Sequence, residues 1–310
     1  MAGASPLWLL GALALQAAFA VNQGGFYQAL FRLLDAGTSL LAAVRLALVM
    51  AFGSLASPAG TATGIAFFVA AASDMGIPTS RAFWVSLAYY LFDYSSTVVV
   101  LAVGLLVLFF HHDLRVSHLI VVAVFYAAVL AAVGVVVVIL VKPHLVRSVL
   151  VPLARAGHRS IGRVRRQPES DGDRAAAWAA DLEEVIMAVR RRPGRALRPL
   201  LHAFSLEGLN LATLAAVFWA VGYAIHPGVL VAGYAIGVLF MIVSITPSGV
   251  GVVEGAMTVT FTSLLVPLES AVAATLLFRL FTFWLPMAAG FISMRVFPVR
   301  GVISRSRSGP

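Results

Sequence analysis

The chain has 310 residues, of which 61% are hydrophobic and 11% are charged, and its mean hydropathy is +0.96. Soluble domains have about 45–50% apolar and about 25% charged residues, so this composition excludes a soluble globular protein and indicates a polytopic membrane protein. The absence of cysteine excludes disulfides, thiolate metal sites and a thiol nucleophile, and the net charge of +9 is concentrated in loops, as expected beside a membrane rather than in a nucleic-acid groove.

The first apolar segment, residues 7–21, is expected to be a retained membrane helix. It ends in Ala-Phe-Ala, as a secretory signal peptide does, but no Lys or Arg precedes Arg32, so the basic region of a signal peptide is missing. Residues 22–35 carry apolar side chains at helical spacing. This predicts a second helix, which either lies at the membrane interface or simply connects to the next segment.

Two apolar arms follow, and a proline–glycine break separates them. The first arm covers residues 39–55, the break (Ser-Pro-Ala-Gly-Thr-Ala-Thr-Gly) covers residues 57–64, and the second arm ends in a turn at residues 73–78. Residues 82–110 are also apolar. This stretch exceeds the about 20 residues of one span, so we expect a break near Asp93.

A basic segment, residues 142–200, divides the chain and follows a predicted span at residues 116–141. It contains 13 Lys/Arg and 6 Asp/Glu, which is typical of a cytoplasmic loop. We expect a solvated loop that touches anionic headgroups, and a docking site for a cytoplasmic enzyme is the alternative. No cofactor is expected. His111, His112 and Asp113 are consecutive in a loop, which does not favour a metal site.

The second half of the chain has the same pattern. Apolar segments at residues 201–225 and 229–245 lead into residues 245–255, where a proline, three glycines and a glutamate interrupt apolar sequence. Apolar residues continue to 266, and a final span is predicted at residues 271–297. The arginine-rich tail after it predicts a cytoplasmic C-terminus.

Residues 39–110 and 229–297 are predicted to be two copies of one unit, an apolar arm, a break, a shorter arm, a turn and a long helix. A shift of 189 residues without gaps aligns their breakers, namely Pro58 with Pro247, Gly60 with Gly249 and Pro78 with Pro267. A broken backbone at membrane depth is tolerated only where it is buried in protein or lines a cavity. We therefore predict re-entrant hairpins, with kinked full crossings as the alternative.

The cytoplasmic loop fixes the orientation of both copies. The first long helix then runs outward and the second inward, so the copies are inverted and the N-terminus lies outside. Inverted repeats with interrupted helices place a substrate site near the midplane of the membrane. The fold class is therefore predicted as an all-α polytopic membrane protein, a single transmembrane domain in the cell (plasma) membrane with an inverted repeat and two re-entrant hairpins.

Two opposite charges occur in the second copy only. Glu254 lies in or just after the break and Arg279 in the long helix, where the first copy has Ile65 and Tyr90. An unpaired ion in hydrocarbon costs at least about 2.5–3.5 kcal/mol, so we expect Glu254 and Arg279 to pair. Either Arg279 binds a lipid phosphate while Glu254 orients it, or the pair is a structural tie between hairpin and helix.

Asp93 and its neighbour Tyr90 are expected to face the same cavity, although a helix-capping role for Asp93 is the alternative. Glu207 lies near the cytoplasmic end of its span, where it could pair with loop arginines. No catalytic set of residues stands out. The candidate substrate-binding residues are Arg279, Glu254, Pro247, Gly249, Gly251, Pro58, Gly60, Asp93 and Tyr90.

Residues 246–256 and 271–290 resemble the transmembrane domain of lysylphosphatidylglycerol synthases and related flippase-like membrane proteins. In that family a Pro-x-Gly-x-Gly-x-x-Glu segment precedes an Ala-rich helix with a central Arg and a Phe/Trp-Leu-Pro end. Residues 57–64 resemble its earlier proline–glycine motif. The resemblance implies a lipid flippase fold that moves an aminoacylated or otherwise modified lipid between leaflets, phosphatidylglycerol lipids among them.

Two departures from the family pattern shape these expectations. The chain ends 13 residues after Phe297, so the aminoacyl-transferase domain of the bifunctional synthases is missing and no enzyme activity is expected. One N-terminal helix that relatives usually have is also missing. The expected partners are lipids with anionic or phosphate headgroups, and homo-oligomers are compatible with the sequence. The alternative function is a non-transporting membrane protein that docks a lipid-modifying enzyme or glycosyltransferase through residues 142–200.

Overall fold

The computed structural model describes residues 5–34, 37–57, 59–110, 187, 193–244 and 246–296. Within these ranges the chain forms helices and no strands, which confirms the predicted all-α membrane fold. The elements are α1 (Pro6–Leu33), α2 (Leu40–Ala56), α3 (Thr61–Asp74), α4 (Thr79–Phe110), α8 (Pro193–Ala220), α9 (Pro227–Val243), the 3-10 turn η1 (Pro247–Gly249), α10 (Val252–Ser263), α11 (Leu268–Arg279), the π-helix η2 (Leu280–Trp284) and α12 (Leu285–Val296).

Four helical segments are long and apolar enough to cross a membrane. They are Pro6–Leu33, Thr79–Gly104, Gly194–Ala220 and Leu268–Val296, the last formed by α11, η2 and α12 together. The helices α2, α3, α9 and α10 have only 17, 14, 17 and 12 residues. At 1.5 Å per residue they are about 18–26 Å long, less than the about 30 Å of a hydrocarbon core. These lengths favour re-entrant hairpins over full crossings.

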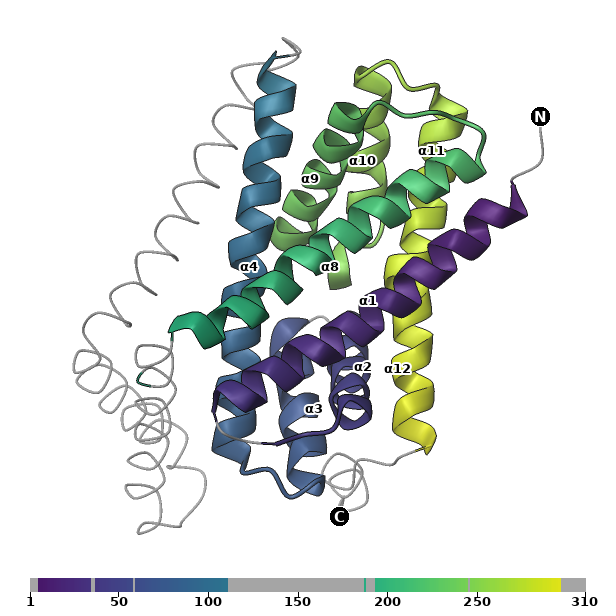
Figure 1. Cartoon of the computed structure of the whole chain (residues 1–310). Coiled ribbons are helices and arrows are strands. Elements are labelled where there is room, and N and C mark those ends of the chain that lie inside the picture. The colour runs from purple at the N-terminus through teal and green to yellow at the C-terminus, as the bar shows by residue number, and fades with distance from the viewer. Residues whose placement is uncertain are drawn as a thin grey trace, which may run out of the picture.

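The two short-helix pairs form hairpins in opposite halves of the molecule. Figure 1 shows α2 and α3 in one half and α9 and α10 in the other. Each hairpin packs against the long helix that follows the other one, because α2 contacts α12 and α9 contacts α4. α2 also contacts η1, so the first hairpin reaches the break of the second.

α1 and α8 lie side by side and run antiparallel across both halves (Figure 1). The Ser5 N–H donates to the Ala220 carbonyl (2.8 Å) at one end, and the Asn22 amide donates to the His202 carbonyl (3.0 Å) at the other. Both helices have 28 residues, and the first hairpin helices α2 and α9 both have 17. The inverted relation of the two copies stays a prediction, and these matched lengths are consistent with it.

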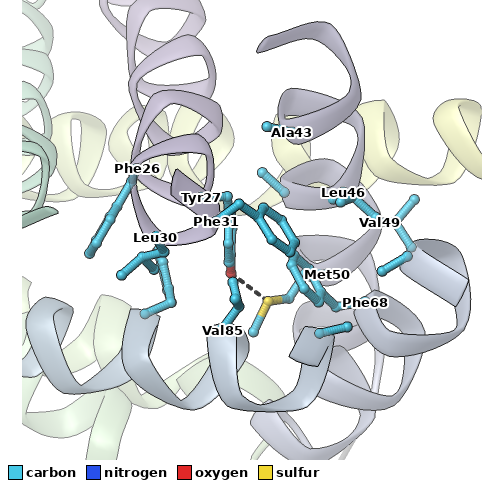
Figure 2. Packing of buried hydrophobic residues seen from close by; sticks show 14 of the residues in the cluster. Phe26, Tyr27, Leu30, Phe31, Ala43, Leu46, Val49, Met50, Phe68 and Val85 are labelled. Atoms are coloured by element: carbon cyan, nitrogen blue, oxygen red, sulfur yellow. Dashed lines mark hydrogen bonds between the residues drawn. The ribbon is translucent and has the colours of Figure 1, made fainter. Parts of the chain in front are cut away.

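Two large apolar cores hold the described helices together, one in each half, beside a small cluster of Leu101, Ala235 and Leu239. The first surrounds the C-terminal part of α1 and includes Phe26, Tyr27, Met50 and Phe68. Figure 2 shows these side chains converging from α1, α2 and α3 beside Val85 of α4, with the Tyr27 hydroxyl donating to the Met50 sulfur (2.6 Å). The second core is formed by α8, α9, α10 and α11, and Ala12 of α1 belongs to it. One helix therefore contributes to both cores.

The prediction of a separate helix over residues 22–35 is wrong for the described part. α1 continues without interruption to Leu33, and Phe26 and Phe31 are fully buried rather than interfacial. The reason is the Gly24-Gly25 pair. A Cβ at Gly24 would lie 2.3 Å from Val44 Cγ2, and one at Gly25 would lie 2.8 Å from His202 Cε1, so these glycines let α1 pack closely between α2 and α8.

The predicted break near Asp93 is also wrong, because α4 is one continuous helix. The Ser95 and Ser96 hydroxyls donate to carbonyls about one turn earlier, on Leu91 (2.7 Å) and Asp93 (2.8 Å). The polar stretch thus satisfies its hydrogen bonds within the helix instead of ending it. α8 begins at Pro193, before the predicted residue 201, and residues 111–186 lie outside the described ranges, including the predicted span 116–141.

Candidate functional site

A cavity of about 760 Å³ lies where the two halves meet. Its walls come from both long antiparallel helices, α1 and α8, from the tips of both hairpins, and from α4 and the α11–α12 segment. Three charged side chains line it within the described ranges, namely Asp93, Glu207 and Arg279. Charged groups facing a cavity between membrane-spanning helices are the usual mark of a transport or binding site.

Arg279 ends α11 and reaches into the cavity with its guanidinium fixed on several sides. Its Nε donates to Glu254 Oε1 at 2.7 Å, and one Nη2–H donates to the Ser248 carbonyl at 2.9 Å. The Cζ atom lies 4.7 Å from the centroid of the Phe283 ring, a cation–π contact. The side chain is only 6% exposed. The ion pair expected from the sequence is therefore present, and it holds the arginine in one orientation.

Glu254 orients Arg279 through this ion pair but does not itself line the cavity. It lies in the first turn of α10, and its second oxygen, Oε2, accepts the Gly251 N–H at 2.6 Å. A carboxylate at this position satisfies an N–H that the helix leaves free and interacts favourably with the helix dipole. One side chain thus starts α10 and orients the cavity arginine.

The tip of the second hairpin needs backbone conformations that favour glycine. Gly249 and Gly251 have φ of +70° and +84°. Ser248, which lies between Pro247 and Gly249, has φ of +49°. A non-glycine residue in this region is uncommon, and its carbonyl is the one that accepts from Arg279. Gly60 (φ +48°) turns the tip of the first hairpin and lines the cavity. Pro58 lies outside the described residues.

The opposite wall of the cavity is one face of α4. Tyr90, Asp93, Tyr94 and Thr97 recur at helical spacing and all line the cavity. The rings of Tyr90 and Tyr94 stack with centroids 5.8 Å apart, and the Tyr90 hydroxyl is 3.5 Å from Ser54 Oγ. The structure thus brings Tyr90, Asp93, Gly60 and Arg279 to one cavity. Of the other predicted residues, Gly249 and Gly251 shape the hairpin turn.

Glu207, which is not among the substrate-binding residues predicted from the sequence, also lines the cavity. Its side chain is buried and accepts two hydrogen bonds, from Thr97 Oγ1 (2.5 Å) to Oε1 and from the Tyr234 hydroxyl (2.6 Å) to Oε2. It therefore binds α4 and α9 rather than the loop arginines considered above, within the part of the chain described. The spacing of Glu207, Asn210 and Thr213 in an apolar helix was the available signal, because these polar residues share one face.

The fold and the cavity together define a polytopic helical membrane protein with a charged cavity between two broken hairpins. The chain belongs to the family described as the lysylphosphatidylglycerol synthase TM region, whose model matches residues 1–290. It is similar to the UPF0104 membrane protein MJ1595 of Methanocaldococcus jannaschii, with 35% identity over 80 residues. That match covers 26% of this chain and 24% of the relative. No solved structure matches the chain.

Proposed function

We propose that this protein is a lipid flippase, which moves a lipid with a phosphate-bearing headgroup between the leaflets of the cell membrane. The headgroup occupies the central cavity and Arg279 binds its phosphate. The observation that carries the proposal is the position of this arginine, fixed by Glu254 and Ser248 at the wall of a cavity that both hairpin tips line.

The guanidinium retains the donors that a phosphate needs. Of its five N–H groups, one is used by Glu254 and one by the Ser248 carbonyl. The remaining three have no partner among the described residues, and Arg279 lines the cavity. A planar fork with free N–H groups matches the geometry of phosphate oxygens. The short contacts to Glu254 and Ser248 already hold the guanidinium in one orientation, so the side chain would lose little further freedom on binding a phosphate.

The walls of the cavity suit a molecule with a polar head and apolar tails. Beside its polar residues, the cavity is lined by Leu13 and Ala17 of α1 and by Leu285 and Ala289 of α12. We propose that acyl chains leave the cavity between these two helices while the headgroup remains at the polar walls. Such passage needs no covalent change in the lipid, so transport without catalysis is part of the proposal.

The test is transbilayer movement of phosphatidylglycerol with a fluorescent label on its acyl chain, followed in proteoliposomes by quenching from outside. The wild-type protein should equilibrate the label, and Arg279→Ala should lose at least about tenfold in rate, because a charge-assisted pair is worth about 1.5–3 kcal/mol. Glu254→Gln keeps Arg279 but removes the ion pair that orients it, so this variant should lose less of the transport rate.

Arg295→Ala is the matched control, because this arginine also lies over a phenylalanine ring (5.2 Å, Phe291) but is exposed at the end of α12. It should transport at the wild-type rate. Full activity in Arg279→Ala, or no movement of any anionic, aminoacylated or polyprenyl-phosphate lipid in the wild type, would sink the proposal. Deleting residues 167–190 distinguishes the flippase from the alternative, a membrane protein that docks an enzyme through residues 142–200. A flippase should keep most of its activity after this deletion, and a docking protein should lose its function.

A further inference from the structure

Glu207 is a buried carboxyl group that the binding of a lipid phosphate at Arg279 does not use. It is the central residue of the apolar span Gly194–Ala220, and it is 6% exposed. The hydroxyls of Thr97 and Tyr234 donate to its two oxygens, and no cation among the described residues pairs with it. A carboxylate removed from water without a cation is costly, and a bound proton removes that cost. Acids buried in membrane-spanning helices form the proton relays of pumps and transporters.

The Thr97 hydroxyl has one hydrogen and two acceptors within reach. Its Oγ1 lies 2.5 Å from Glu207 Oε1 and 3.1 Å from the Asp93 carbonyl oxygen. Thr97 therefore donates to an ionised Glu207, whereas a protonated Glu207 donates to Thr97, whose hydrogen then turns to the Asp93 carbonyl. The Tyr234 hydroxyl donates to Glu207 Oε2 (2.6 Å) in both cases. Glu207 is thus hydrogen-bonded at both oxygens in either charge state.

Other charged or titratable groups among the described residues face the same cavity from each helix that packs against α8. They are Tyr27 of α1, Tyr89, Tyr90, Asp93 and Tyr94 of α4, Tyr234 of α9 and Arg279 of α11. Tyrosine and arginine keep their protons near neutral pH. The hydrogen bonds that Asp93 receives from Ser96 and Thr97 go to its backbone carbonyl. Glu207 is therefore the carboxyl group whose surroundings accommodate both the gain and the loss of a proton.

The charges of the cavity wall link this proton to the proposed lipid. Asp93 and Glu207 are the anions of the described lining. Its cation, Arg279, is already paired with Glu254, which lies outside the lining. A lipid phosphate bound at Arg279 adds a negative charge, and like charges repel strongly in surroundings of low dielectric constant. A proton on Glu207 removes one of these charges, so lipid binding and protonation of Glu207 favour each other.

We propose that Glu207 carries one proton across the membrane with each lipid phosphate, which makes this protein a proton-coupled lipid transporter. This inference rests on the proposed function and adds its source of energy. Glu207 takes the proton at Oε1 from the aqueous side to which the cavity is open and releases it after the cavity has opened to the other side. No bond other than this O–H forms or breaks. The proton gradient then drives the lipid from the leaflet on the acidic side to the leaflet on the alkaline side.

The test follows acyl-labelled phosphatidylglycerol in proteoliposomes that have a pH difference of one unit across the membrane. Valinomycin and equal potassium concentrations on both sides hold the membrane potential at zero, and protein-free vesicles give the baseline. One proton moved with each lipid should enrich the label about tenfold in the leaflet on the alkaline side, because one pH unit is a tenfold difference in proton activity. This ratio does not depend on the orientation of the protein in the vesicles.

Glu207→Gln separates the proton from the hydrogen bonds. The glutamine amide can donate to Thr97 and its carbonyl can accept from Tyr234, but the side chain has no proton to exchange. In nanodiscs, the wild type should bind phosphatidylglycerol at least about fivefold more tightly at about pH 6 than at about pH 8, which is the lower end of typical coupling between two ligands. Glu207→Gln should bind it equally at both pH values.

Glu269→Gln is the matched control, because Glu269 is exposed in the first turn of α11 and lies outside the cavity lining. It should show the enrichment and the pH dependence of the wild type. An equal distribution of the label in the wild type despite the pH difference, or pH-dependent binding that persists in Glu207→Gln, would overturn the proton site. Failure of the flippase proposal would look different, as the absence of protein-dependent movement of the label or full activity in Arg279→Ala.

Discussion

Glu254 uses its two carboxylate oxygens for two tasks that are usually separate. Oε2 accepts the Gly251 N–H at the start of α10, and Oε1 accepts from Arg279. The start of a hairpin helix and the orientation of the cavity arginine thus depend on one side chain. A shift of the α10 N-terminus therefore moves the guanidinium with it, which couples hairpin geometry directly to the proposed phosphate site.

At Gly251, we expect substitution by alanine to destabilise the protein by about 1–2 kcal/mol, because the residue has φ of +84° and an L side chain is disfavoured there. The matched control is Gly255→Ala, four residues later inside α10, where an added Cβ meets nothing within 4 Å. This change should be neutral or stabilise by about 0.5–1 kcal/mol. Thermal unfolding in detergent measures both. Equal midpoints for the two variants would contradict the strained-turn explanation.

At the level of single residues, the sequence predicted the Glu254–Arg279 pair because the cost of an isolated ion in hydrocarbon leaves few alternatives. It did not predict the environment of Glu207. That carboxylate is compensated by hydroxyls from Thr97 and Tyr234, which lie 110 and 27 residues away along the chain. Neutral donors carry no charge pattern that a sequence could show, so only the packing of α4, α8 and α9 reveals them.

The last membrane helix changes its winding directly after Arg279. Residues Leu280–Trp284 form a π-helix, in which the Leu285 N–H bonds to the Leu280 carbonyl five residues earlier. Pro286 follows, and it has no N–H to offer the Thr282 carbonyl. The Thr282 hydroxyl donates to the Phe278 carbonyl (2.9 Å), one turn earlier. π-bulges are frequent at functional sites, and this one begins beside the cavity arginine.

The contact between α12 and α2 depends on Gly290. A Cβ there would lie 2.4 Å from the Leu48 carbonyl oxygen and 2.7 Å from Phe52 Cβ, so backbone on α2 would have to move. We expect Gly290→Ala to cost about 1–3 kcal/mol through overpacking. Gly208→Ala in α8, where an added Cβ has nothing within 4 Å, is the control and should not lower the unfolding midpoint. An unchanged midpoint for Gly290→Ala would show that the helices separate without cost.

Helix positions were largely predictable from the sequence, and helix continuity was not. The hairpin helices α2 and α9 lie within two residues of the predicted arms, because Pro and Gly mark their ends. The break expected near Asp93 and the separate helix expected at residues 22–35 are both absent. The polar residues in both stretches favour an interruption. Burial against α8 and local hydroxyl-to-carbonyl bonds allow those same residues to remain inside continuous helices.

Across the whole molecule, α1 and α8 connect the two halves. α1 contributes Ala12 to the core around α9 and α10 and Phe26 to the core around α2 and α3. The cavity lies between these cores, and α1 supplies Gln16 and Gln23 to its wall. In the proposed flippase, a movement of one core along α1 or α8 would open the cavity toward one leaflet. This is the geometry that alternating access between packed bundles requires.

The proposed topology can be tested with single thiols, since the chain has no cysteine of its own. Ser73 and Ala224 lie in exposed segments at the ends of α3 and α8. We expect Ala224→Cys to react with a membrane-impermeant maleimide on intact cells, and Ser73→Cys to react only after permeabilisation. Labelling is read by mass shift on gels, and transport activity confirms that each variant is folded. Reaction of both thiols from the same side would rule out the inverted arrangement.

The pairing of α1 with α8 also has a consequence for the order in which the chain is made. Gln16 donates to Thr213 and Asn210, and Asn22 donates to His202, partners that are 197, 194 and 180 residues further along the chain. Ribosomes add about 5–20 residues per second, so roughly 10–40 s separate the synthesis of these side chains from that of their partners. During that interval the first helix holds its polar groups without the contacts that satisfy them in the finished protein.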